Sequence, residues 1–168
     1  MDFLELAHKR FSVLEYERRP VEQGKIDSII EAGLAAPTAC NRQPQRILVI
    51  DSDEGRRKLN RVIPSKYYVP IAFLIGYQKE ECWVRPMDGK SSGEIDASIV
   101  ATHMMLEMTD LGLDSIWVMY WDPENMKREF ELDSNMEPVA LLIAGYQSQE
   151  AHPRRGHLES KPKEHILI

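Results

Sequence analysis

The spacing of apolar residues predicts helices and strands that alternate along the chain. Apolar positions that recur with a period near 3.6 residues indicate helices, and short runs rich in isoleucine and valine indicate buried strands. Helices are predicted over residues 3–10, 20–35, 53–63, 94–111 and 123–132, and strands over residues 46–51, 71–77, 115–120 and 138–146. The stretches 36–44 and 78–93 are predicted to be loops. From this alternation alone a doubly wound parallel α/β sheet is expected.

The helix predicted over residues 94–111 is apolar nearly all the way round. A helix with this pattern is expected to be buried on all sides. In a domain of this size, a long helix without a polar face suggests that a partner subunit covers part of it, so an oligomer is expected. Gly112 supplies a typical stop for the helix.

Length and composition favour one soluble domain over residues 1–168. The chain has 168 residues, 43% of them hydrophobic, which is enough for one sizeable core. The 21 basic and 27 acidic residues give a net charge of −6, which argues against nucleic acid or an anionic membrane surface as a partner. The longest apolar run, 139–144, is too short to span a membrane, and the N-terminal sequence has no secretory pattern. A cytoplasmic location is therefore expected.

Several common functional motifs are absent or incomplete. Cys40 and Cys82 form neither a CxxC pair nor a cluster, so no disulfide framework or zinc site is predicted. The dinucleotide fingerprint GxGxxG is missing, and the sequence Gly89-Lys90-Ser91 lacks the earlier glycine of a phosphate-binding loop. The histidines near the C-terminus lie in a polar tail without carboxylates or thiols at ligand spacing, and no metal is assigned.

A series of short motifs, in the right order along nearly the whole chain, resembles the flavin-dependent nitroreductase family. In chain order they are KRFS at residues 9–12, Tyr16, PV at 20–21, APTACNRQP at 36–44, DASI at 96–99, LGLDS at 111–115 with Trp117, Asp122, and PVAL at 138–141 before Gly145-Tyr146. Each motif alone would be unconvincing. Their order and spacing together carry the resemblance.

The resemblance implies an α+β fold with a mostly antiparallel central sheet flanked by helices, in an intertwined homodimer. This expectation replaces the parallel sheet. The helix at residues 94–111 would lie at the dimer centre, and residues 147–168 would form a C-terminal extension packed on the partner.

The resemblance also implies FMN as the cofactor and a ping-pong oxidoreductase reaction. NAD(P)H would deliver a hydride to the flavin and leave, and an electron-poor small molecule such as a nitroaromatic or a quinone would then take two electrons. Protein groups would position the flavin and tune its potential. No side chain is required as an acid or base, so no catalytic residue is assigned.

The FMN phosphate is a dianion, and without a glycine-rich cradle it needs cationic side chains. Arginine is favoured because its guanidinium can bind a phosphate through two parallel hydrogen bonds. The family pattern assigns this role to the basic-hydroxyl segment near the N-terminus and to a cation near the C-terminus. The predicted residues are Arg10, Phe11, Ser12 and Lys161, with Arg154 and Arg155 as alternatives to Lys161.

Two further segments are expected at the flavin. By position in the family motif, Pro37, Thr38 and Asn41 reach across the dimer interface to the ring and ribityl chain of the other subunit. Val118 and Met119 fall where the family lines the ring with backbone groups.

Two positions depart from the family pattern. Leu14 stands where many relatives have a second basic residue, and Gln45 replaces the family tryptophan. Positive charge near the ring stabilises reduced, anionic flavin, so this loss makes reduction harder unless Lys66 or another group substitutes. A non-catalytic flavin carrier or sensor of the same fold is therefore an alternative function. A nucleotide-binding module that uses the loop 78–93 is a third hypothesis, which rests only on the partial phosphate-loop match.

Overall fold

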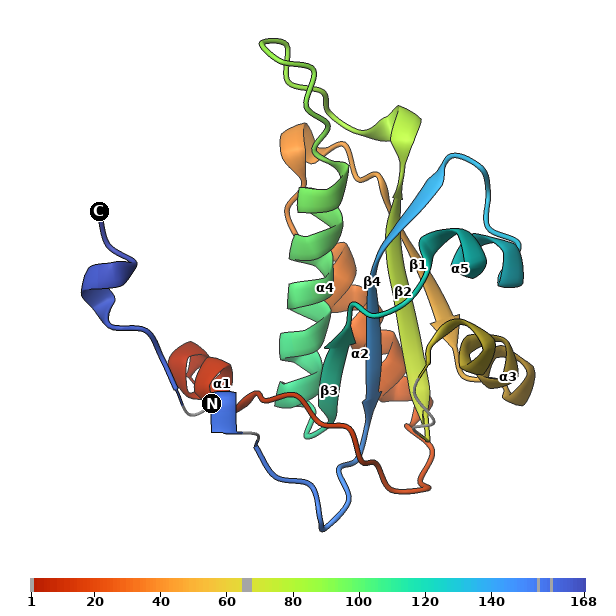
Figure 1. Ribbon diagram of the computed structural model, residues 1–168, viewed down its shortest axis with the longest axis vertical. Coiled ribbons are helices and arrows are strands. Elements are labelled where there is room, and N and C mark those ends of the chain that lie inside the picture. Colours follow the sequence, from red (N-terminus) through yellow and green to blue (C-terminus); the bar gives the residue numbers. More distant parts are fainter. Residues whose placement is uncertain (1, 65–67, 154, 158) are drawn as a thin grey trace.

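Four antiparallel strands form one sheet (Figure 1). The computed structural model describes residues 2–64, 68–153, 155–157 and 159–168. The strands are β1 (Gln45–Ile50), β2 (Ile71–Gln78), β3 (Asp114–Val118) and β4 (Met136–Gly145), in the spatial order β1-β2-β4-β3. Each neighbouring pair is antiparallel. The expectation of an antiparallel α+β fold is confirmed.

The parallel sheet expected from the alternation alone is wrong. The helix between the first two strands, α3 (Asp53–Val62), does not carry the chain back to the starting end of the sheet. The chain instead enters β2 at the end where β1 finishes, because Ile50 pairs with Ala72. Alternating helices and strands are therefore compatible with either strand direction, and the hydrophobic pattern does not distinguish them.

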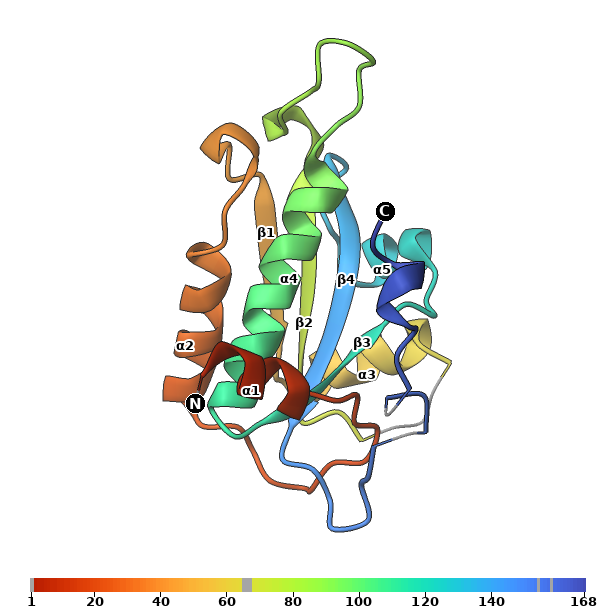
Figure 2. The ribbon, with the colours of Figure 1, turned by 90° about the vertical axis from the view of Figure 1, so that its left-hand side faces the viewer.

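Helices cover both faces of the sheet (Figures 1 and 2). The remaining helices are α1 (Phe3–Lys9), α2 (Gln23–Leu34), α4 (Gly93–Asp110) and α5 (Pro123–Glu129), and short 3-10 turns lie at Ala39–Asn41, Lys79–Glu81, Arg155–His157 and Lys163–His165. α2 and α4 pack on one face, and α3 and α5 pack on the other. None of the described helices is both long and apolar enough to cross a membrane.

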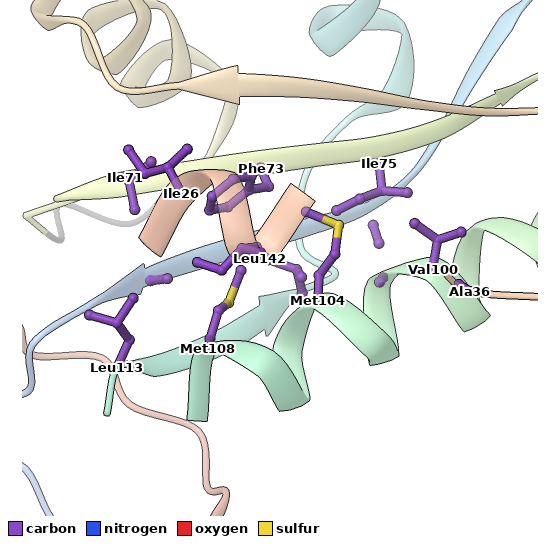
Figure 3. Close-up of a cluster of buried hydrophobic side chains, with 14 of the residues drawn as sticks. Ile26, Ala36, Ile71, Phe73, Ile75, Val100, Met104, Met108, Leu113 and Leu142 are labelled. Atoms are coloured by element: carbon purple, nitrogen blue, oxygen red, sulfur yellow. The ribbon is translucent and has the colours of Figure 1, made fainter. Parts of the chain in front are cut away.

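Alternation along β2 divides the core into two layers. Phe73 and Ile75 point toward α2 and α4 and contact Met104 and Leu142 in the cluster of Figure 3. Leu74 points to the opposite layer, under α3 and α5. A strand buried on both faces needs apolar residues at successive positions, which explains the unbroken apolar run at the start of β2.

Local capping groups set most helix ends where the sequence predicts them. The Asp2 side chain accepts a hydrogen bond from the Glu5 amide at 2.9 Å, and the Glu5 side chain accepts one from the Asp2 amide. This pair of bonds is a capping box. Ser52 caps α3 through the Gly55 amide at 3.0 Å. Gly112 follows α4 with φ +74°, a left-handed conformation that favours glycine. The second helix begins later than expected, at Gln23.

One copy of the chain does not bury α4 on all sides. Its inner face packs on the sheet through residues such as Val100 and Met104, both fully buried. On the outer face Ile95 is 54% exposed, and it lines a shallow hollow together with Ile99 and His103. One copy of the chain therefore leaves part of the apolar surface of α4 exposed.

The C-terminal segment leaves the sheet after β4 and passes α1 (Figures 1 and 2). One contact point is the His157 ring, whose centroid lies 5.9 Å from that of Phe11. Beyond this contact the segment extends away from the sheet, and the apolar side chains at its end, Ile166 and Leu167, are exposed.

Candidate functional site

The segment Arg10–Ser12 is fixed against the start of β3. Arg10 closes α1, and its amide donates to the Leu6 carbonyl at 3.2 Å. Ser12 pairs with Ser115, and the Val13 amide donates to the Ser115 carbonyl at 3.1 Å. The Arg10 side chain is half-buried, and within the described part of the chain no group accepts a hydrogen bond from its guanidinium. This cation is therefore available to an anionic ligand.

Phe11 anchors the segment. It packs on the core layer under α3 and α5, whereas Ser12 is exposed. Its contact with His157 places the turn Arg155–His157 beside α1. Of the alternative cations, Arg154 and the side chain of Arg155 lie outside the described part of the chain. Lys161 is exposed, and no hydrogen bond or ring contact within the described residues joins it to Arg10.

Ser115 carries an unsatisfied polar atom next to Ser12. The residue is 1% exposed, and its Oγ has no hydrogen-bond partner among the described residues. A buried hydroxyl without a partner is unfavourable, and most such groups in proteins find one. The preceding Asp114 is half-buried, and burial raises the pKa of its carboxyl, against the opposing effects of the Gln147 amide and Lys9.

Among the described residues, the lining of a small cavity beside Ser12 contains no lysine or arginine. Leu14, Glu15, Glu150 and His152 are among the described residues that line it. Nδ1 of His152 lies 2.9 Å from the Glu150 carbonyl oxygen, which can only accept. Nδ1 therefore carries the hydrogen. Lys66, the proposed substitute for the cation missing at Leu14, lies outside the described residues.

The loop after α2 has an unusual backbone. Cys40, Asn41 and Gln43 have φ values of 51°, 53° and 52°, in the left-handed region that non-glycine residues rarely adopt. Thr38 closes the loop by accepting from the Gln43 amide at 3.0 Å. Pro37 and Asn41 are exposed and Thr38 is half-buried, so Pro37 and Asn41 are accessible to a second molecule.

The two groups of predicted site residues lie at opposite ends of α4. The loop is bonded to the first turn of α4, where the Ala39 amide donates to Asp96 at 2.9 Å. Ser12 lies beside Ser115, which follows the last turn. At about 1.5 Å per residue, roughly 20 Å of helix separates them. One copy of the chain therefore does not assemble them around one small ligand.

The end of β3 differs from the expectation. The strand stops at Val118, so Met119 lies beyond it and is 71% exposed. The chain turns here because the Trp121 indole donates to the Val118 carbonyl at 2.8 Å. The Met119 sulfur accepts from the Trp117 indole at 2.9 Å. Trp121 was not among the predicted site residues.

The nitroreductase family model matches residues 7–67 and 67–146, which is most of the chain. The chain belongs to the nitroreductase family. Within that family, a nitroreductase family protein from Clostridium difficile 630 shares 41% sequence identity and superposes with a TM-score of 0.94, covering 100% of this chain and 98% of that one.

Relatives of lower identity match over nearly the whole chain. A protein named NADH dehydrogenase from Thermus thermophilus is 26% identical over 185 residues, covering 91% of this chain and 90% of the relative. A structure from Exiguobacterium sibiricum, described as a nitroreductase in complex with FMN, has 20% identity and a TM-score of 0.87, covering 100% of this chain and 97% of that one.

Two site features of this nitroreductase-family chain were missed from the sequence. Asp96 holds the loop, and Ser115 has an unpartnered hydroxyl, although both lie in motifs that carry the resemblance. The available signal for Asp96 was a carboxylate between two apolar residues, Ile95 and Ala97, at the start of a helix that is otherwise mostly apolar. For Ser115 no such signal existed, because partners of a buried hydroxyl depend on the fold.

Proposed function

We propose that this protein is an FMN-dependent oxidoreductase that uses NAD(P)H to reduce an electron-poor small molecule, such as a nitroaromatic or a quinone. The observation that carries the proposal is a cation and a hydroxyl at one end of α4 that have no hydrogen-bond partner among the described residues. These are the half-buried Arg10 guanidinium and the exposed Ser12 hydroxyl. A cation and a hydroxyl donor suit the phosphate of FMN.

The residues have distinct roles in this proposal. Arg10 and Ser12 bind the phosphate, and backbone groups of Val118 and Met119 flank the ring. Lys161 or Arg155 supplies a further cation from the C-terminal segment. When bound, FMN supplies the two-electron centre between NAD(P)H and the acceptor. The names NADH dehydrogenase and nitroreductase among the relatives support this class of reaction.

We infer that the functional unit is a homodimer formed through the outer face of α4. That face exposes Ile95 and presents half-buried Ile99 within one chain. A two-fold axis that crosses this face at right angles to α4 sets the two helices antiparallel. The loop with Thr38 and Asn41 in one copy then approaches Arg10 in the other. The segment 147–168 packs on the partner.

The cavity beside Ser12 favours a second candidate, a flavin carrier or sensor without turnover. Leu14 contributes no positive charge there, and the lining includes the carboxylates of Glu15 and Glu150. Such surroundings stabilise anionic reduced flavin less than a basic residue does. The reductive half-reaction distinguishes the two candidates.

The test is the visible spectrum of the purified protein after FMN is added and the excess is removed, followed by anaerobic NADH and NADPH. A yellow protein that bleaches supports the oxidoreductase. A yellow protein that stays oxidised supports the carrier, and a colourless protein contradicts both. Arg10→Ala should release FMN, whereas Arg57→Ala, an exposed arginine on α3, should retain it. Full flavin in Arg10→Ala would refute the phosphate assignment.

A further inference from the structure

Asp96 is a buried carboxylate with two specific partners. It is 1% exposed, and no cation of the described chain pairs with it. Its Oδ1 accepts from the Ala39 amide at 2.9 Å, and its Oδ2 accepts from the Ser92 hydroxyl at 2.7 Å. Burying a charge without a counter-ion is unfavourable, so a buried carboxylate is expected to have a role that an apolar residue cannot fill.

The Ser92 side chain bonds to the Asp96 carboxylate instead of capping α4. It is the N-cap residue of α4, where a serine side chain normally accepts from an amide of the first turn. Here it makes no such bond, and its hydroxyl donates to Asp96. The side chain of Asp96 is thereby fixed from the helix side. Its other oxygen is directed at the loop.

The loop 37–43 needs contacts from outside itself to keep its conformation. Cys40, Asn41 and Gln43 all have left-handed backbone conformations, which cost free energy and persist only where the surroundings impose them. Ala39 directly precedes the first of these residues, so the bond to Asp96 fixes the loop where the strained part begins. On the far side, the Arg42 side chain donates to the Glu81 carbonyl at 3.2 Å.

We propose that Asp96 is a positioning residue that presets the loop 37–43 for contact with the flavin of the partner subunit. It acts through the Ala39 amide and does not touch the cofactor. This inference rests on the proposed function, because it assumes that Thr38 and Asn41 complete a flavin site. Fixing the loop before FMN arrives reduces the ordering cost of binding.

The test compares Asp96→Ala, Asp96→Asn and Ser92→Ala with the parent. Asparagine keeps an acceptor for the Ala39 amide and a donor for the Ser92 oxygen, so it should rescue what alanine loses. Asp110→Ala is the matched control, since Asp110 is an exposed aspartate in the last turn of the same helix. Amide hydrogen exchange of the FMN-free protein and FMN titration are measured for each variant.

In Asp96→Ala, the Ala39 amide should exchange at least about tenfold faster while the amides of β2 and β4 keep their protection, and the Kd for FMN should rise about tenfold or more. Asp96→Asn and Asp110→Ala should stay within about threefold of the parent in both measurements, and Ser92→Ala should shift both in the direction of Asp96→Ala by less.

Parent-like exchange at Ala39 in Asp96→Ala would overturn the proposal. So would a loosened loop that leaves FMN affinity unchanged. If the parent itself binds no FMN, the proposed function fails, and the exchange rates alone then support or overturn the hold of Asp96 on the loop. If Asp96→Ala does not fold, the Ala39 amide exchange of Ser92→Ala is compared with that of Asp96→Asn. Faster exchange in Ser92→Ala supports the proposal, and equal exchange overturns it.

Discussion

Replacing Ile95 by alanine tests whether the outer face of α4 joins two copies of the chain. Full burial of an isoleucine side chain is worth up to about 3 kcal/mol. Since Ile95 is 54% exposed in one copy, covering the exposed part gives about 1.5 kcal/mol. A two-fold interface buries it in both copies, so the dimer loses about 2–3 kcal/mol, and its Kd should rise about 30- to 150-fold.

Sedimentation equilibrium over a concentration series measures this Kd directly. Leu34→Ala is the matched control, because Leu34 is 56% exposed at the end of α2 and lies outside the hollow lined by Ile95. The control should stay within about threefold of the parent. FMN affinity should fall with the dimer fraction, because one copy holds only part of the site. An unchanged dimer Kd in Ile95→Ala, or a monomeric parent, would refute the reasoning.

Three further changes have specific outcomes. Ser115→Ala removes a buried hydroxyl that has no partner among the described residues, so the FMN-free protein should gain about 1 kcal/mol in thermal or urea unfolding; a loss of stability would show that the hydroxyl has a partner. Burial raises the pKa of Asp114, so the stability it contributes is present below about pH 4 and is lost as pH rises through the raised value. Asp114→Asn should therefore be more stable than the parent at pH 7 and show a weaker pH dependence in urea unfolding across the acid range, and equal pH profiles would contradict this. In Gly76→Ala the new Cβ would lie 2.4 Å from the Glu137 carbonyl oxygen, so unfolding free energy should fall by about 3 kcal/mol or more, and a smaller loss would mean that the strands move apart easily.

The elements of the fold were readable from the sequence because each is specified locally. Asp2 and Ser52 cap their helices through bonds within the first turn. Strand direction is not specified locally, because it depends on where the chain returns after α3. The resemblance supplied the antiparallel arrangement that the hydrophobic pattern left undetermined.

The candidate phosphate ligands Arg10 and Ser12 come from the family resemblance and from the need for a cation at a phosphate, and they stay predictions. The structure leaves both without a competing partner inside the described chain. The place of Met119 was less predictable, because the end of β3 is set by the bond from the Trp121 indole to the Val118 carbonyl. Such a bond depends on tertiary structure rather than on a motif.

Three incomplete features of one copy have a common explanation in a second copy with a bound anionic cofactor. The outer face of α4 is more apolar than a free surface needs to be, and Ile95 is its most exposed large side chain. Within the described chain, the guanidinium of Arg10 and the hydroxyl of Ser12 have no hydrogen-bond partner at one end of the helix, while the strained loop held by Asp96 presents Asn41 at the other. In the proposed dimer, an antiparallel pair of α4 helices would bring these two ends together. A sequence can indicate the apolar helix face and the cation, but it does not contain the symmetry operation that brings two copies together, so the proposed flavin site depends on the proposed dimer.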